Sequence, residues 1–295
     1  MTQGITQNRD IRTASIALVC GGMLWGLYWI PVRFFLEMGL DGAWPGIAMY
    51  TTALVVLIPI LWRSRQALAQ EWRGLVFSGV FTGAAFSLYS ISLAYTEVAR
   101  SILLFYLTPI WGTVLGFVFL GERLGPLRLL SLLCGVCGLF VVLGGEQSIP
   151  WPRNVGDWLA LISGMTWAVG TLGLYRTKSV PVGGQIFAFL FGALILSIVS
   201  LFLGAGALRL NGSNGVLMDV LPFAALSVLY TLPMIYLTIW PSTKLTPARV
   251  GLLLMSEVVV GLMSAALLSG EPFGMREFFG ATLIVSAAFL EIARG

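Results

Sequence analysis

The sequence predicts an all-α integral membrane protein whose ten transmembrane helices form two inverted five-helix repeats. Three observations predict it: an extreme apolar composition, apolar runs of membrane-crossing length, and a pattern that recurs in both halves. Hydrophobic residues make up 58% of the 295 residues and charged residues only 10%, whereas soluble domains carry about 25% charged residues. The apolar runs are roughly 20 residues long, enough to cross a hydrocarbon layer of ~30 Å as a helix. In lipid such runs must be helical, because only a helix satisfies their backbone groups internally.

Ten apolar segments follow one another along the chain, at 13–35, 43–62, 73–94, 98–120, 127–144, 155–175, 184–203, 220–241, 246–269 and 275–292. They predict a cytoplasmic N-terminal segment (1–12), a first repeat (13–144), a periplasmic connection (145–154) and a second repeat (155–295). The longest connections, 145–154 and 204–219, contain turn-forming residues and leave no room for a soluble catalytic domain. The basic start followed by a long apolar run is read as an uncleaved first helix.

The basic residues predict the orientation, because short loops rich in Lys and Arg stay on the cytoplasmic side. With both termini inside, five of the 17 basic residues lie outside: Arg33, Arg100, Arg153, Arg209 and Arg276. The other twelve lie inside: Arg9, Arg12, Arg63, Arg65, Arg73, Arg123, Arg128, Arg176, Lys178, Lys244, Arg249 and Arg294. This bias predicts a multi-pass protein of the cell inner (plasma) membrane with cytoplasmic termini. Topology also accounts for the net charge of +4, so nucleic acid is not an expected partner.

An internal repeat relates residues 99–125 to residues 248–274 at a constant offset of 149. The shared pattern, A-R-x2-L-L-x7-G-x8-G-E-x2-G, gives eight identities, half of them or more at Arg, Glu and Gly. A shorter echo relates Gly22-Met23-Leu24-Trp25 to Gly164-Met165-Thr166-Trp167. Together they pair the first segment with the sixth and the fourth with the ninth. Each half therefore holds five helices, and an odd number inverts the second half.

Inverted halves can exchange inward-open and outward-open conformations around a fixed central site. The sequence therefore favours transport by alternating access. Two alternatives stay open: a duplication retained only for folding, and a channel, since some channels also carry inverted repeats.

The motifs that surround the repeat resemble those of the drug/metabolite transporter superfamily, in its ten-helix exporter branch. They are Ser92-Leu93-Ala94-Tyr95 before the fourth helix, Pro109 within it, Gly121-Glu122 at its end, and Gly135 with Gly138 in the fifth. Within the superfamily the chain is similar to aromatic amino acid exporters. The resemblance implies a central cavity lined mainly by helices one, three, four, six, eight and nine. The chain departs from the pattern where Met255-Ser256-Glu257-Val258 lacks the proline often present in the ninth helix.

Two residues in the paired helices are candidates for function. Pro109 lies in the middle of the fourth segment, where proline kinks a helix, and we expect either a gate or a static bend. Glu257 is a carboxylate near the centre of an apolar span. A charge there is costly to bury, so it should face a partner or a wet cavity. It is expected to bind a substrate ammonium or a coupling proton, the alternative being a structural hydrogen bond between helices.

Aromatic residues concentrate on the helices that would line the pathway. Those expected to bind substrate, with Glu257, are Trp25, Tyr28, Trp29, Phe86, Tyr89, Phe105, Tyr106, Trp167, Tyr230 and Tyr236. Trp25, Tyr28 and Trp29 are spaced to share one helix face. Aromatic rings stack with flat apolar groups and attract cations. Core packing and interfacial belts are the alternatives.

Several function classes are excluded by what the sequence lacks. It has no histidine and no G-x-x-x-x-G-K loop, so we expect no ATP hydrolysis and no cofactor. The lone pair Cys134 and Cys137 has no second ligand pair, so no metal site is expected. An intramembrane hydrolase or acyl transferase would need a nucleophile and a base. The sequence has no histidine and no paired mid-span carboxylates, so we expect no enzyme.

The sequence therefore favours an exporter of small organic metabolites, with aromatic or large apolar amino acids as the expected substrates. Its expected partners are that substrate and the lipid bilayer, without an obligate protein partner. A multidrug exporter of hydrophobic cations is the alternative. Either proton coupling or downhill export would be compatible with the residues.

Overall fold

A computed structural model describes residues 2–40, 42–96, 101, 104–123, 125–143, 152–176, 180–204, 216–269 and 274–293. Arg100, Gly270, Glu271 and most of the connection 145–154 lie outside these residues. The helices of the first half are α1 (Thr2–Trp25), α2 (Trp29–Glu37), α3 (Trp44–Gln70), α4 (Trp72–Tyr95), α6 (Thr108–Leu120) and α7 (Pro126–Leu143). Those of the second half are α8 (Val155–Arg176), α9 (Val182–Phe202), α10 (Val216–Ser242), α11 (Pro247–Leu254), α12 (Ser256–Ser269) and α13 (Met275–Ala293).

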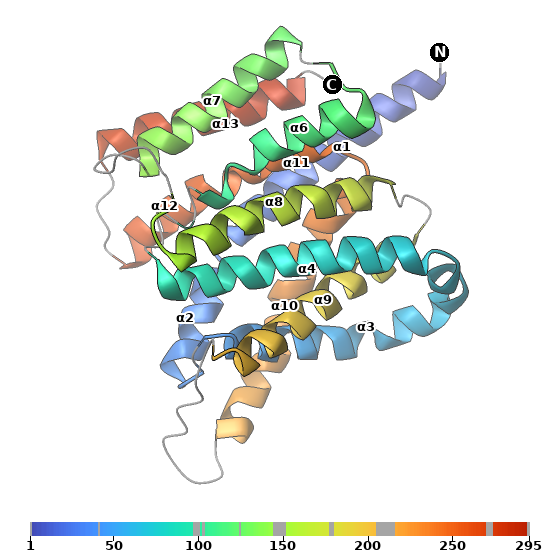
Figure 1. The fold of residues 1–295 in the computed structure, drawn as a ribbon, viewed down its shortest axis with the longest axis vertical. Coiled ribbons are helices and arrows are strands. Elements are labelled where there is room, and N and C mark those ends of the chain that lie inside the picture. Colours follow the sequence, from blue (N-terminus) through green and yellow to red (C-terminus); the bar gives the residue numbers. More distant parts are fainter. Residues whose placement is uncertain are drawn as a thin grey trace.

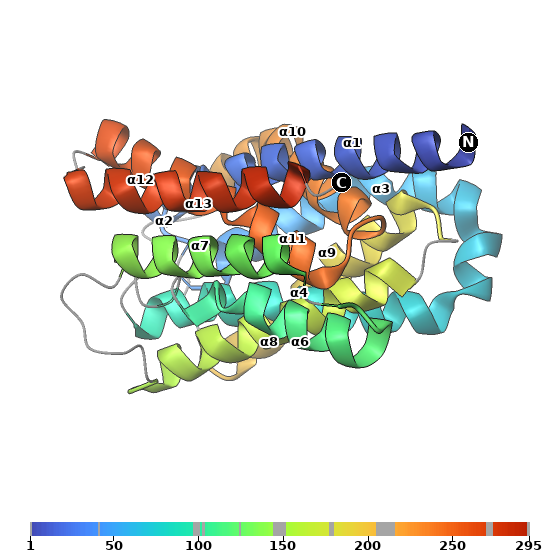
Figure 2. The ribbon, with the colours of Figure 1, turned by 90° about the horizontal axis from the view of Figure 1, so that it is seen from above.

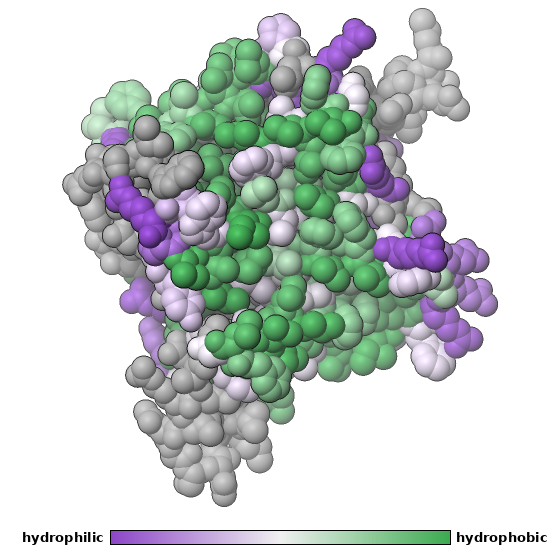
Figure 3. All heavy atoms as spheres, in the orientation of Figure 1, coloured by the Kyte–Doolittle hydropathy of each residue, from purple (hydrophilic) through white to green (hydrophobic). Residues whose placement is uncertain are grey.

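The protein is an all-helical membrane protein, as predicted. Seven helical stretches of the described chain are long and apolar enough to cross a membrane, and two shorter apolar helices run over Thr108–Leu120 and Pro126–Val141. The helices run roughly side by side (Figure 1). On the face drawn in Figure 3, hydrophilic side chains gather mainly at the left and right margins, with hydrophobic ones between them. The apolar surface therefore lies along the middle of the helices, where lipid would cover it.

Three predicted segments are interrupted. The first is divided between α1 and α2 around Gly26–Tyr28, and the ninth between α11 and α12 at Met255. In the fourth, Tyr106 and Leu107 form a turn before α6 begins. The number of apolar segments is unchanged. Three of them, however, consist of two helical pieces each. At its start, α1 includes residues 2–12, which were predicted to precede the first span.

Packing between the two halves follows the repeat. The pairs α4 with α8 and α4 with α9 have the counterparts α10 with α1 and α10 with α3 when the halves are exchanged, and all four pairs are in contact. The pairs α3–α9, α6–α11 and α7–α13 map onto themselves and are also in contact. In both ribbon views α7 and α13 lie side by side, and α1 begins and α13 ends toward the same side (Figures 1 and 2). This arrangement is that of an inverted repeat.

The interleaving of the halves depends on close approach between helices. A Cβ atom on Gly79 of α4 would lie 2.5 Å from the carbonyl oxygen of Ala188 in α9. On its other side α4 meets α8, where the Ser163 hydroxyl donates a hydrogen bond of 2.6 Å to the carbonyl of Ala85. Likewise α10 meets α3 through Thr52, whose hydroxyl lies 3.0 Å from the carbonyl of Ala224. Thus α4 and α10 each form the middle of a three-helix group drawn from both halves.

The repeated Gly-Glu motif ends α6 in a left-handed residue. Gly121 has a φ of +65°, a conformation in which glycine is favoured at helix C-termini. The next residue, Glu122, forms an ion pair of 2.8 Å with Arg128 at the start of α7. The Arg128 side chain is only 2% exposed, so this pair is buried in the bundle.

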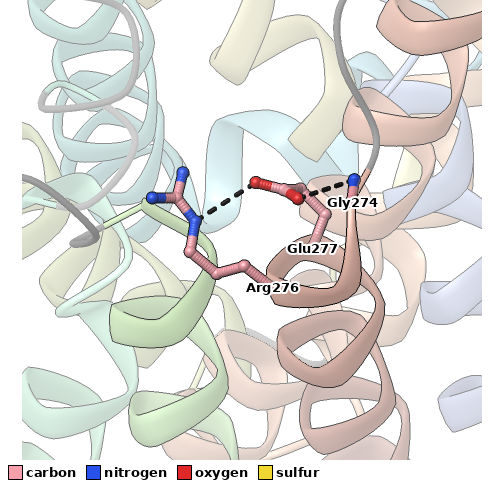
Figure 4. A network of polar contacts seen from close by, with 3 residues as sticks. All are labelled: Gly274, Arg276 and Glu277. Atoms are coloured by element: carbon pink, nitrogen blue, oxygen red, sulfur yellow. Dashed lines mark hydrogen bonds and ion pairs between the residues drawn. The ribbon is translucent and has the colours of Figure 1, made fainter.

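At offset 149 from Arg128, the second half carries the opposite charge, Glu277. Figure 4 shows its carboxylate at the start of α13, where it accepts a hydrogen bond of 2.8 Å from the backbone N–H of Gly274. The Arg276 side chain, 48% exposed, reaches the other carboxylate oxygen at 3.2 Å. Glu277 is therefore a helix cap, whereas its repeat counterpart is part of a buried ion pair.

Candidate functional site

Two interruptions meet near the centre of the molecule. Tyr106, before α6, and Met255, between α11 and α12, are separated by the repeat offset of 149, and α6 packs against α11. The kink expected at Pro109 in the middle of a helix is not found. Pro109 occupies the first turn of α6 and is buried. Proline suits that position because the first N–H groups of a helix have no intrahelical partner. Met255 closes α11 without a proline, its N–H bonding to the carbonyl of Leu252 at 3.3 Å.

A hydrogen bond joins the two interruptions across the halves. The hydroxyl of Tyr106 donates to the carboxylate of Glu257, in the first turn of α12, and the same hydroxyl lies 3.3 Å from the carbonyl oxygen of Leu254. The Tyr106 side chain is 1% exposed, so this side of the hydrogen bond is shielded from water. One carboxylate oxygen of Glu257 therefore has a hydrogen-bond partner, as a buried carboxylate requires.

A cavity lies beside this hydrogen bond. Its volume, counted for water-sized molecules, is about 40 Å³, and its walls come from both halves. The lining residues are Trp25, Ala85, Phe86, Tyr89, Phe105, Trp167, Phe189, Leu254 and Glu257. Glu257 is the one carboxylate among them. A cavity of this size admits a few water molecules, so an organic molecule enters only when the walls move apart.

The rings in and behind the cavity wall form two sets of contacts, one around Phe86 and one around Phe105. Phe86 is at the centre of the first set, with ring centroids 5.0 Å from Trp25, 5.4 Å from Tyr28 and 6.1 Å from Phe189. Phe189 in turn lies 6.3 Å from Trp167. On the side of Glu257, the ring of Phe105 lies 4.9 Å from Tyr89 and 5.1 Å from Tyr106. Most of these pairs are tilted or edge-to-face, the geometries that ring quadrupoles favour.

Six of the eleven sequence-predicted binding residues line this cavity: Trp25, Phe86, Tyr89, Phe105, Trp167 and Glu257. Tyr28 and Tyr106 stand one layer behind. The Tyr28 hydroxyl lies 3.3 Å from that of Tyr50, while Tyr106 holds Glu257.

Trp29, Tyr230 and Tyr236 do not belong to the cavity wall. Because the first segment breaks after Trp25, the expected common face of Trp25, Tyr28 and Trp29 does not form; the Trp29 indole instead donates to the hydroxyl of Ser264 at 3.0 Å. Tyr230 donates to the backbone carbonyl of Leu24. Tyr236 is 46% exposed and stacks on Trp240 at the outer surface.

Three lining residues were not predicted, namely Ala85, Phe189 and Leu254. The resemblance implied a wall from the eighth helix, whereas the structure supplies Phe189 from the seventh, in α9. Phe189 stands in a long apolar run that holds three further phenylalanines. Its local pattern therefore carries no signal that separates a lining residue from a core residue.

No group of three or more metal-ligating side chains occurs within the described residues. Cys134 and Cys137 are both free thiols on α7.

Comparison with known proteins relates the first half of the chain to a family of transporters. Residues 12–144 match the EamA-like transporter family. This match covers somewhat less than half of the chain, so its first half is similar to EamA-like transporters. The matched residues coincide with the first predicted repeat, from the first to the fifth apolar segment.

Individual relatives of the chain are distant. The chain is 26% identical over 187 residues to "Uncharacterized transporter YvbV" of Bacillus subtilis strain 168, an alignment that covers 61% of this chain and 58% of the relative. It is 23% identical over 187 residues to "Probable amino-acid metabolite efflux pump" of Escherichia coli K12, covering 61% and 62%. The chain therefore spans about three fifths of the length of these relatives.

A solved crystal structure shares the fold of this chain over almost its whole length. The TM-score is 0.73, and the match covers 94% of this chain and 96% of the other. The sequence identity is 20%, so the likeness concerns the fold.

Proposed function

We propose that this protein exports small organic metabolites across the inner membrane by alternating access, with aromatic or large apolar amino acids as substrates. The observation that carries the proposal is the position of Glu257, a lone carboxylate in a ring-walled cavity where two inverted repeats meet. The relative named as an amino-acid metabolite efflux pump supports the substrate class. A wall of Phe, Tyr and Trp rings accepts an aromatic or large apolar side chain by stacking and burial.

Glu257 is proposed to bind the substrate ammonium. An ionised carboxylate in such surroundings is stabilised by a positive charge that replaces water, and the neighbouring rings attract the same cation through their quadrupoles. At the size that the cavity has here, the Tyr106 hydroxyl is hydrogen-bonded to one oxygen of the Glu257 carboxylate. Substrate entry would therefore loosen a hydrogen bond that joins the two halves, which links binding to movement of the interrupted helices.

Alternating access requires two arrangements of similar energy, and the exchangeable contacts of the fold support them. The halves are interleaved, which argues against the rocking of two separate five-helix blocks. We infer that the moving units are the groups centred on α4 and α10, each held by contacts with two helices, namely α8 and α9, and α1 and α3. The cavity lies between Trp25 of one group and Phe86 of the other.

The proposed orientation places both termini in the cytoplasm. In that orientation the basic ends Arg63–Arg65 of α3 and Arg73 of α4 face the cytoplasm, and Arg33 and Arg276 face outward. Labelling of single cysteines at positions 65 and 276 with a membrane-impermeant maleimide on intact cells tests this. Position 276 should react and position 65 should not; the reverse result would invert the topology.

The decisive test of function is uptake into proteoliposomes that hold the purified protein. Labelled phenylalanine, tryptophan, glutamate and a lipophilic cation are compared for the unmodified protein and for Glu257→Gln. We expect transport of phenylalanine and tryptophan only, lost in Glu257→Gln and retained in Glu37→Gln, a matched change at an exposed residue whose side chain is 70% exposed. Transport of the cation alone would replace the amino acid proposal with a drug exporter in which Glu257 is the counter-charge.

A further inference from the structure

Trp167 lines the cavity, and its indole N–H is a hydrogen-bond donor without a partner. The residue is 5% exposed. Its Nε1 atom is buried and has no hydrogen-bond partner. Buried donors are almost always paired in folded proteins, because leaving one unpaired forfeits the hydrogen bond it makes with water. An unpaired donor in the wall of a binding cavity therefore points to a ligand as its partner.

The repeat shows how this donor differs from its counterpart. Trp25 corresponds to Trp167 in the four-residue echo between the first and sixth spans. The indole N–H of Trp25 donates to the hydroxyl of Thr238 at 2.9 Å. One half of the molecule thus pairs the indole N–H of its tryptophan internally, and the other half leaves that N–H unpaired.

The polar groups of the cavity wall have distinct chemistry. Glu257 offers a carboxylate, which suits a cation, whereas an indole N–H can only donate and suits an oxygen with lone pairs. The other indole, that of Trp25, is already bonded. An α-amino acid carries both a cation and an acceptor oxygen on one carbon, whereas a lipophilic cation carries only the first.

We propose that Trp167 donates its indole N–H to a carboxyl oxygen of the substrate while Glu257 holds the ammonium group. The assignment rests on the proposed function and deepens it, because it makes Trp167 the residue that separates amino acids from simple amines. The aromatic rings then select the side chain, and the two polar groups select the amino acid backbone. Such two-point recognition discriminates strongly, since a ligand without the acceptor leaves a buried donor unpaired.

The experiment is equilibrium binding by titration calorimetry, with purified protein in detergent and three ligands of one shape. Phenylalanine has the ammonium and the carboxylate, phenylalaninamide keeps a carbonyl oxygen without the negative charge, and phenethylamine has neither oxygen. We expect the unmodified protein to bind phenethylamine about tenfold or more weakly than phenylalanine, with phenylalaninamide between them. This comparison needs no variant and does not depend on the folding of one.

The variant Trp167→Phe then removes the donor and keeps a ring. It should weaken phenylalanine binding by about tenfold and change phenethylamine binding less than twofold. Trp158→Phe, the same change at a residue 47% exposed, is the control and should alter neither.

The outcomes separate this assignment from the proposed function. Equal weakening of phenylalanine and phenethylamine in Trp167→Phe would make Trp167 a packing residue and overturn the assignment, leaving the exporter intact. Equal affinity of the unmodified protein for both ligands would also overturn it. Binding of none of the three would refute the amino acid exporter and the assignment together.

Discussion

The buried ion pair between Arg128 and Glu122 gives a sharp prediction for stability. Arg128→Met replaces the guanidinium with an apolar chain of similar length, and it leaves the Glu122 carboxylate, 19% exposed, without its partner at 2.8 Å. Removing one member of a buried pair costs about 3–5 kcal/mol, because the remaining charge is uncompensated. On the scale for domains of this general size, that lowers the Tm by roughly 6–20 °C.

The double variant Arg128→Met with Glu122→Gln tests the cause. It removes both charges, and replacing a buried pair with uncharged groups is often close to neutral. We expect the double variant to regain most of the loss in Tm, measured by thermal unfolding of the purified protein in one detergent. The control is Arg33→Met, which removes an exposed pair at 3.7 Å with Glu37 and should shift the Tm little. A double variant as unstable as Arg128→Met would refute the reasoning.

Three further predictions concern the cavity and its frame. Tyr106→Phe deletes the hydroxyl that holds Glu257 and should slow proteoliposome uptake of phenylalanine by about tenfold or more; Tyr50→Phe, which removes the hydroxyl beside Tyr28, is the matched control, and equal effects would contradict a special role. Gly79→Val places a side chain against the carbonyl of Ala188 and should cost about 1–3 kcal/mol, seen as a lower Tm; an unchanged Tm would contradict close helix contact. Tyr236→Phe should leave uptake unchanged, because Tyr236 lies on the outer surface; a loss of uptake would return it to the pathway.

The number of crossings could be predicted because lipid imposes one length on every apolar run. The interruptions could not, because Gly26–Tyr28 and Met255 stand in runs as apolar as their neighbours. The prediction from proline was wrong in the opposite way, because it placed a kink inside a helix where the structure begins one. Pro109 lies at the centre of an apolar run and yet stands in the first turn of α6, directly after the turn at Tyr106 and Leu107.

The site was predictable where chemistry marks a residue and not where only packing does. Glu257 stands out because a carboxylate is costly in lipid. Phe189 does not, since its role depends on which face of α9 meets Phe86 and Trp167. Tyr236 was included for its ring and its helix, but the direction of its side chain depends on tertiary packing that one sequence does not reveal.

The repeat counterpart of Glu257, at offset 149, is Thr108, whose hydroxyl bonds to the carbonyl of Phe105 at 2.6 Å. In the alternating-access mechanism that we propose, a frame whose contacts survive exchange of its halves opens to either side of the membrane at comparable cost. The carboxylate has no twin, so a charged ligand bound to it meets different surroundings in the two open states. The two states then differ in affinity for one ligand, and it is this difference that a ligand uses to shift their populations. A single unduplicated charge thus makes the two open states of a duplicated frame unequal in affinity, while the concentration gradients set the direction of net transport.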